Sequence, residues 1–320
     1  MRRSKKIIKN TASNIFLQVV MAAVQFVSLP FLLKHFGKEV YGIFILAYSV
    51  YTFAFFLNSA IQLTLMKYVS QEYAKKDFIK LNSVINNMWI VGFLNHFFVA
   101  LCMFLIAYYG ICWFNISATL QAQAQQIFIV IGLCCLVKGF FSVYGGVLCG
   151  LQKIHENNLI NSIELILRVC IIYYVVCFGK SLLFYVCGLN ILFVSVSIGQ
   201  YMYTKKVVPE IKIHLRKFVN FREFKDLFGF NFCQIINSVS DILMYNSDKL
   251  IIQKVMGISS IVMYEVANKP NLLFQRFVSL PLSAILPACS DAYARKDKDF
   301  LNKILIQGTR FYLTLILPVI

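Results

Sequence analysis

The sequence is poor in charge and in residues that build catalytic or metal sites. Asp, Glu, Lys and Arg make up 14% of its 320 residues, against about 25% in soluble globular domains. The four histidines show no metal-ligand spacing, and the ten cysteines never form Cys-x-x-Cys. We therefore expect neither a metal site nor a cofactor. Because no catalytic constellation is present, we do not expect an enzyme.

Hydrophobic residues, in contrast, make up 59% of the chain. Crossing the hydrocarbon core of a membrane takes about 20 mostly apolar residues per helix. Eight such spans are predicted, at residues 12–34, 42–66, 84–109, 122–149, 159–178, 182–203, 228–253 and 262–286, with a ninth opening near residue 304. The predicted fold is an all-α polytopic membrane protein. Because the ninth span is incomplete at Ile320, we expect a C-terminally truncated chain.

The distribution of Lys and Arg predicts the orientation of these spans. Of the 31 basic residues, 21 lie before the first span or in every second loop, and four lie in the opposite loops. The positive-inside rule then places the N-terminus and the basic loops in the cytoplasm. The connector at residues 205–227 is the most basic loop, and anionic lipid headgroups are a sufficient partner for its charge. We expect no nucleic acid partner.

A short motif occurs twice in the chain. Residues 70–82 read SQEYAKKDFIKLN, and residues 290–302 read SDAYARKDKDFLN. The constant offset of 220 residues indicates two parallel repeats. We predict a six-helix N-terminal lobe at residues 1–204, the connector at 205–227, and a partial C-terminal lobe at 228–320. The motif itself is interpreted as a cytoplasmic hinge-end element whose two copies bridge to each other.

The same offset relates polar stripes on the first and seventh spans. At 100° per residue, Asn14, Gln18, Gln25 and Ser28 share one helix face. The corresponding face of the seventh span carries Gln234, Ser238, Tyr245 and Asp248, joined by Asn237 and Asp241. Such a face either packs against other helices through hydrogen bonds or lines a water-filled cavity. The two acids favour the cavity.

Other spans carry charges and glycines with specific expectations. Lys138 lies in the middle of the fourth span, where we expect it to face a cavity. Glu164 and Arg168 are spaced for an i, i+4 pair. Glu265, Lys269 and Arg276 share one helix face around Pro270; Glu265 and Lys269 either neutralise each other or belong to a functional site. Gly37 and Gly257, related by the offset, are predicted to end helices with positive φ.

Several short motifs resemble a known family. Residues 29–32 (LPFL) and 36–42 (FGKEVYG) are similar to its opening hairpin, and residues 150–153 (GLQK) with Asn158 and Arg168 to its fourth-to-fifth span junction. Asp248, Lys249, Gly257, Tyr264, Ala267, Asn268 and Pro287 resemble the matching elements of the second lobe. The family is that of the polysaccharide repeat-unit flippases, the O-antigen type in particular, of the multidrug/oligosaccharidyl-lipid/polysaccharide flippase superfamily. Its members have twelve to fourteen spans in two six-helix lobes, with spans 1, 2, 7 and 8 lining a central cavity.

The resemblance implies a transporter that flips an oligosaccharide on a polyprenyl diphosphate across a bacterial cytoplasmic membrane by alternating access, together with other polysaccharide assembly proteins. A diphosphate requires cations at membrane depth. The substrate-binding candidates are Arg168, Arg276, Lys138, Lys249 and Lys269, with Gln18, Gln25 and Tyr245 for the sugar. Coupling to H⁺ or Na⁺ would use Asp248, Asp241 or Glu265. The alternatives are a cation-coupled multidrug exporter of the same fold and an inactive remnant.

Overall fold

The computed structural model describes residues 2–271 except 56, 115 and 216–220, together with 302, 305–310 and 313–314. Within these residues the chain is nearly all helical and has no strand, which confirms the predicted all-α class. The helices are α1 (Arg2–Ala54), α2 (Leu57–Lys75), α3 (Phe78–Leu105), α4 (Ala118–Gly139), α5 (Tyr144–Gly150), α6 (Ile154–Cys177), α7 (Leu182–Val207) and α9 (Phe221–Met256). A π-turn at Ile106–Gly110 and a 3₁₀ turn at Ile111–Trp113 extend α3, and residues 258–271 are helical.

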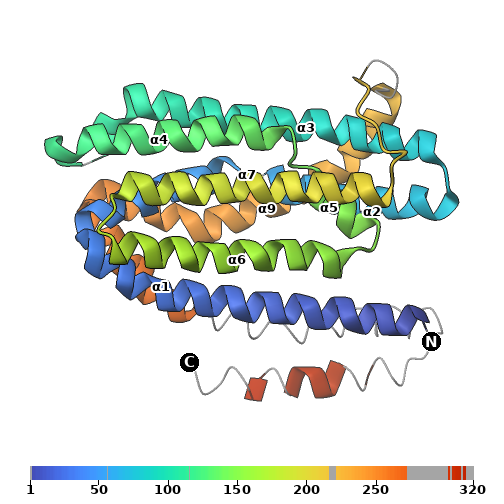
Figure 1. The fold of residues 1–320 in the computed structure, drawn as a ribbon, viewed down its shortest axis with the longest axis horizontal. Helices are drawn as coiled ribbons and strands as arrows, with labels where there is room; N and C mark the ends of the chain where they lie inside the picture. Colours follow the sequence, from blue (N-terminus) through green and yellow to red (C-terminus); the bar gives the residue numbers. More distant parts are fainter. Residues whose placement is uncertain are drawn as a thin grey trace.

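Two glycines turn the chain at one end of the molecule. Gly37 interrupts α1 with φ 77° and ψ 168°, and Figure 1 shows the chain turning there and running back. Gly257 has φ 87° and separates α9 from the helix at 258–271. Because a Cβ disfavours positive φ, glycine suits both positions. The predicted turns are confirmed, and the offset of 220 residues relates them.

Two predicted spans consist of two helical pieces each. The second span is interrupted between Ala54 and Leu57, and the fourth is interrupted at residues 140–143, between α4 and α5. The predicted spans 42–66 and 122–149 are therefore each built from two helical pieces. Hydropathy cannot detect such breaks, because the residues that form them are as apolar as their neighbours.

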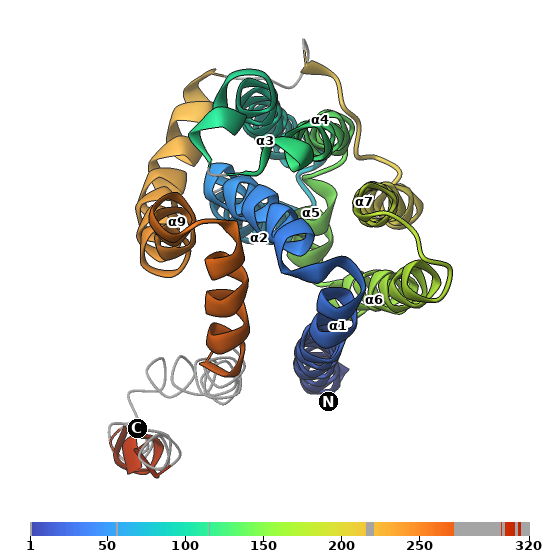
Figure 2. The same ribbon diagram turned by 90° about the vertical axis from the view of Figure 1, so that its left-hand side faces the viewer.

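The helices run along the long axis of the molecule (Figure 1), and α2 lies in the middle with α3, α5 and α9 against it (Figure 2). Close packing of α5 on α2 depends on glycine. A Cβ on Gly146 would lie 2.6 Å from Oε1 of Gln62, and a Cβ on Gly150 would lie 2.7 Å from Cβ of Val69. Small residues at such contacts let helix backbones approach closely in membranes.

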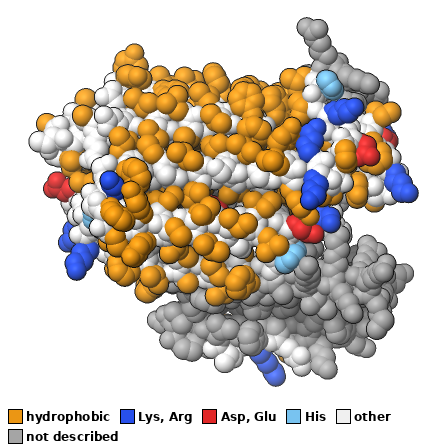
Figure 3. Space-filling view, in the orientation of Figure 1, with side chains coloured by type: hydrophobic (Ala, Val, Ile, Leu, Met, Phe, Trp, Pro, Cys, Tyr) orange, Lys and Arg blue, Asp and Glu red, His pale blue; other side chains and the backbone are white. Residues whose placement is uncertain are grey.

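The surface between the two ends of the bundle is apolar. In the face shown in Figure 3, hydrophobic side chains cover the helices, and charged side chains gather at the two ends. Five helical stretches of the described chain are long and apolar enough to cross a membrane: Phe16–Thr52, Phe78–Trp113, Ala118–Gly139, Ile154–Cys177 and Leu182–Val207. Exposed apolar helix faces of this length fit a lipid environment. The chain is a multi-pass membrane protein.

The first copy of the repeated motif forms the turn between α2 and α3. Lys75 pairs with Glu72 at 2.7 Å, Lys76 has φ 58°, and the Asp77 side chain accepts a hydrogen bond from the backbone N–H of Lys80 and so caps α3. Residues 290–301 of the second copy lie outside the described residues. The expected bridge between the two copies therefore stays a prediction.

Candidate functional site

A polar cavity of about 420 Å³ lies among the helices of the N-terminal lobe. Most of its lining side chains carry amides, hydroxyls or charges. The lining residues are Asn58, Gln62, Lys138, Ser142, Gly145, Cys149, Asn157, Asn161, Glu164, Phe193, Val196, Ser197 and Gln200. Such groups hydrogen-bond well to a hydroxyl-rich ligand, and they are costly to place at membrane depth without a partner.

The break in the fourth span forms one wall of this cavity. The break frees two backbone carbonyls from helical hydrogen bonds, and side chains of neighbouring helices donate to both. Gln62 of α2 donates to Ser142 O at 2.9 Å, and Trp89 of α3 donates to Phe140 O at 3.0 Å. The break is thus held by neighbouring helices, as unwound backbone within a membrane requires.

One face of α6 forms another wall. Asn157, Asn161 and Glu164 follow the i, i+4, i+7 spacing that places side chains on one helix face. The amide of Gln200 on α7 reaches across and donates to Asn157 Oδ1 at 3.0 Å. Sequence reasoning did not select these amides as site residues, although their spacing on α6 is a signal that a helical projection detects.

Two cations flank one aromatic ring beside the cavity. Lys138 Nζ lies 5.4 Å from the ring centroid of Phe193 and 5.5 Å from that of Phe55, and the guanidinium carbon of Arg168 lies 5.3 Å from the Phe193 centroid. A cation over an aromatic face is stabilised by the ring quadrupole. Phe193, from α7, therefore brings together two cations from α4 and α6. No sequence signal pointed to Phe193.

The two cations differ in their charge partners. Arg168 donates to Glu164 Oε1 from Nη2 at 2.6 Å and from Nε at 2.9 Å, which confirms the predicted i, i+4 pair. Lys138 has no carboxylate within 4.0 Å among the described residues. With Glu164 and Arg168 neutralising each other, this group carries a formal charge of +1. Lys138 lines the cavity as expected, and its binding role stays a prediction.

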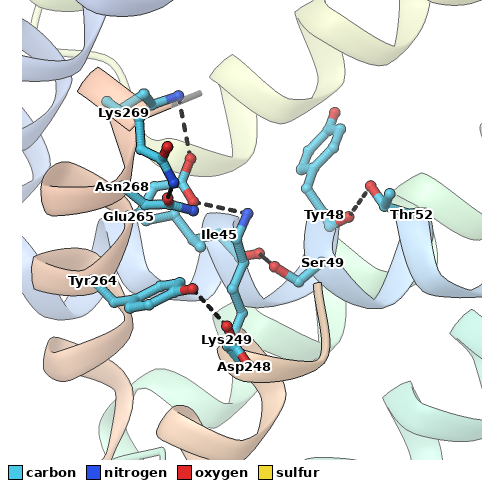
Figure 4. A network of polar contacts seen from close by, with 11 residues as sticks. Ile45, Tyr48, Ser49, Thr52, Asp248, Lys249, Tyr264, Glu265, Asn268 and Lys269 are labelled. Atoms are coloured by element: carbon cyan, nitrogen blue, oxygen red, sulfur yellow. Dashed lines mark hydrogen bonds and ion pairs between the residues drawn. The ribbon is translucent and has the colours of Figure 1, made fainter. Parts of the chain in front are cut away.

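A second group of charges lies between α9 and the helix at 258–271 (Figure 4). Glu265 pairs through Oε2 with Lys249 at 2.8 Å and through Oε1 with Lys269 at 3.2 Å. Close by, Tyr264 donates to Asp248 Oδ2 at 2.8 Å. Glu265 and Lys269 thus pair, which was one of the two alternatives predicted for them. Glu265 also pairs with a second lysine, Lys249, from another helix.

Gln18 and Gln25 do not line the polar cavity. Gln18 is exposed and Gln25 is half-buried. Arg276 and the side chains of Asp241 and Tyr245 lie outside the part of the chain that the structure describes. Of the four spans expected to line a central cavity, the second contributes Asn58 and Gln62 to this one. The first and seventh spans include side chains that are not described, and the eighth extends into residues 272–286, which are not described, so that expectation stays a prediction.

A second cavity, of about 480 Å³, lies between α1 and α6 and has an almost wholly apolar lining. Val24, Val27 and Phe31 come from α1, and Ile172 and Val176 from α6. Val27 and Phe31 are more than half exposed. On α6 the groove begins one residue after Arg168, at Val169. The helix therefore carries charge on one face and an apolar groove on another.

Comparisons with known proteins agree with this architecture. A family model described as "polysaccharide biosynthesis protein" matches residues 7–293. Among solved structures, the chain is similar to a MOP superfamily transporter from Pyrococcus furiosus. The two are 15% identical, with a TM-score of 0.73 over 98% of this chain and 70% of that chain. That structure is described as having a binding pocket of reverse polarity, which suggests a different function. A search of curated proteins returned no match.

Two solved structures described as a multidrug resistance MATE family transporter of the MOP superfamily are also similar in fold. One, in an inward-facing conformation, is 12% identical with a TM-score of 0.73, over 97% of this chain and 72% of that chain. The other, in an outward-facing conformation, is 13% identical with a TM-score of 0.61, over 90% of this chain and 71% of that chain. The chain has the fold of MOP superfamily transporters.

Proposed function

Because the chain belongs to the polysaccharide biosynthesis protein family, we propose that it flips a polyprenyl-diphosphate-linked oligosaccharide from the inner to the outer leaflet of a bacterial cytoplasmic membrane. The product would serve the assembly of O-antigen or another surface polysaccharide. In this proposal the two lobes rock by alternating access, the N-terminus is cytoplasmic, and no covalent bond of the substrate is changed. An oligosaccharide on a diphosphate presents hydroxyls and negative charge to the protein.

The observation that carries the proposal is Lys138, a cation that pairs with no carboxylate within 4.0 Å among the described residues. It lies in a cavity lined mostly by amides and hydroxyls, with Glu164 as the lining carboxylate among those residues. An ammonium group at membrane depth is costly unless an anion compensates it. A phosphate oxygen of the substrate would supply this compensation, and the amides of α6 and α7 would bind sugar hydroxyls. Arg168, whose guanidinium carbon lies 5.3 Å from the Phe193 ring centroid, would contribute once it leaves Glu164.

The lipid tail requires a place outside the polar cavity. The apolar groove between α1 and α6 offers one, because burying hydrocarbon there removes no polar group from water. A cationic drug, the substrate class expected of a multidrug exporter, would instead meet the positive charge of Lys138 in the cavity. The charge of the site therefore favours an anionic substrate over the rival function.

Ion coupling is assigned to the second charged group. Glu265 is shared by Lys249 and Lys269, so a movement of α9 relative to the helix at 258–271 changes which lysine holds it. Asp248 lies beside it with Tyr264 as a partner. A carboxylate released from a lysine can take up H⁺ or Na⁺ in its place, which is the coupling step that we propose.

The proposal is tested by binding of a lipid-linked oligosaccharide to the purified protein in detergent. Lys138→Gln removes the charge with little change in length, and we expect it to weaken binding by about tenfold or more, the usual range for loss of a charge-assisted hydrogen bond. Lys138→Arg should retain most of the affinity. The matched control is Lys67→Gln, an exposed lysine of α2 outside the cavity. Equal affinity of wild type and Lys138→Gln would contradict the assignment.

A further inference from the structure

One buried imidazole in α3 has a nitrogen without a partner. His96 is 1% exposed, and its Nδ1 lies 2.8 Å from the carbonyl oxygen of Gly92, one turn earlier on the same helix. Because a carbonyl oxygen can only accept, Nδ1 carries a hydrogen and donates it. In the neutral ring Nε2 is then a bare acceptor, and it is buried with no hydrogen-bond partner among the described residues. A buried acceptor without a donor is costly, so Nε2 is available to a proton.

His96 lies close to the cation of the polar cavity. Its ring packs edge-to-face on Phe55, which lies in the break between α1 and α2. The His96 ring centroid lies 4.7 Å and Lys138 Nζ lies 5.5 Å from the ring centroid of Phe55, so the imidazole and the ammonium are at most about 10 Å apart. Gly139, the residue after Lys138, lets α4 approach, because a Cβ there would lie 3.0 Å from Cβ of His96. Two helices thus bring a protonatable nitrogen near a cation.

The charge that acts on this imidazole, within the described part of the chain, is that of Lys138. Cys135, the other titratable group on this side of α4, is buried one turn before Lys138. Phe55 is apolar, and Tyr51, which stacks on it with 5.1 Å between ring centroids, is neutral at physiological pH. The charged residues of α2 begin at Lys67, and those of α9 with described side chains are Asp248, Lys249 and Lys254. His96 does not line the polar cavity, so little water screens it from Lys138.

This proximity makes the charge on either group depend on the other. With Lys138 charged, a proton on His96 is opposed by repulsion. Two unit charges about 10 Å apart, at an effective dielectric constant of about 20, change each other's proton affinity by roughly tenfold. An anion bound to Lys138 cancels this repulsion. By linkage, a proton on His96 then strengthens binding of the anion by the same factor.

We propose that His96 is a proton-binding site linked to the anion site at Lys138: an anion that binds Lys138 brings one proton from solvent to Nε2 of His96, and this proton strengthens binding of the anion. The inference rests on the proposed anion at Lys138, and it names the residue through which pH regulates that site. No bond of the anion is changed. The site is separate from the coupling step at Asp248 and Glu265.

The link between the two groups can be measured without any ligand. The chain has four histidines, so NMR of protein carrying isotope-labelled histidine follows each ring, and His96→Asn assigns the His96 signal. At neutral pH the wild-type signal should show a hydrogen on Nδ1 and none on Nε2. Lys138→Gln should raise the proton affinity of His96 by about tenfold, whereas Lys67→Gln, an exposed lysine of α2, should leave it unchanged. The same titration of His96 in wild type and Lys138→Gln would overturn the link.

Binding of sulfate tests the anion side of the proposal, because sulfate stays a dianion across the physiological pH range. In calorimetry of the purified chain in detergent, the affinity for sulfate should rise as the pH falls, by up to about tenfold per pH unit for one proton taken up. Lys138→Gln should bind sulfate at least about tenfold more weakly. The heat of binding should depend on the buffer, because the proton is drawn from it.

The matched variant for this measurement is His96→Asn. Asparagine keeps a donor for Gly92 O, as Asn82 and Asn86 donate to the carbonyls one turn earlier on α3, but it takes up no proton. Its affinity for sulfate should therefore not depend on pH. Sulfate binding by the wild type without proton uptake at His96 would overturn the proposal and leave the proposed function intact. No sulfate binding at any pH would remove the anion site, and with it both the role of Lys138 and the link.

Discussion

At the scale of single residues, the site depends on how each buried charge is compensated. Arg168 and Glu164 neutralise each other through two hydrogen bonds on one carboxylate oxygen, whereas Lys138 relies on the faces of two aromatic rings. A ring compensates a charge less than a carboxylate does. Under the proposed function, Lys138 is therefore the cation that we expect to bind an anionic ligand.

The Glu164–Arg168 pair can be tested by a double-mutant cycle. Both side chains are mostly buried, at 11% and 19% exposed, so Glu164→Gln should destabilise the protein by about 3 kcal/mol by leaving the guanidinium without its partner. The Glu164→Leu, Arg168→Leu double variant should lose less stability than the Glu164→Leu or the Arg168→Leu single variant. Thermal unfolding in detergent measures both. Additive losses would show that the two side chains do not interact.

At the scale of helices, the turns were predicted well and the breaks were not. Gly37 and Gly257 were predictable because a helix end that needs positive φ selects glycine locally. The Glu164–Arg168 pair was predictable because it lies within one helix. The break at residues 140–143 is held by side chains of other helices. The approach of Lys138 and Arg168 to Phe193 and the bonding of Asn82 to the connector are also contacts between different helices or segments. Contacts between distant segments leave no local pattern in one sequence.

The two glycine turns give a prediction at this scale. A Cβ at Gly257 would have nothing within 4 Å, so the cost of Gly257→Ala is purely conformational and should be about 1–2 kcal/mol of stability. Gly257→Asn should cost less, because asparagine tolerates positive φ better. Gly37→Ala and Gly37→Asn should follow the same order. Thermal unfolding of the four variants checks this, and an alanine variant as stable as wild type would contradict the role of φ.

At the scale of the whole molecule, α9 and the residues that follow it contact α1, α2 and the end of α3. Near the Gly37 end, a Cβ on Gly42 would lie 2.8 Å from the carbonyl oxygen of Ile258, so the two backbones are in close contact. Further along, Ser59 of α2 and Ser238 of α9 are hydrogen-bonded, with 2.5 Å between their hydroxyl oxygens. Lys254 Nζ also donates to Trp113 O at 2.6 Å. An alternating-access cycle has to break such contacts at one end of the molecule while others form.

The contact between Ser59 and Ser238 allows a reversible lock. Cysteines at both positions should form a disulfide under mild oxidation, because the two side chains already touch. We expect the crosslink to stop transport and reductant to restore it, with each single cysteine variant as the control. Full transport by the crosslinked protein would show that α2 and α9 move as one body.

We propose that this chain moves a lipid-linked oligosaccharide across a membrane by way of the polar cavity at Lys138. Transbilayer movement of a fluorescent polyprenyl-diphosphate oligosaccharide in proteoliposomes, followed by reduction of the probe in the accessible leaflet, tests this proposal. Wild-type and Lys67→Gln protein should move the probe, and Lys138→Gln protein should move little or none. Movement at the wild-type rate by Lys138→Gln protein, or no movement by the wild type, would refute the proposal.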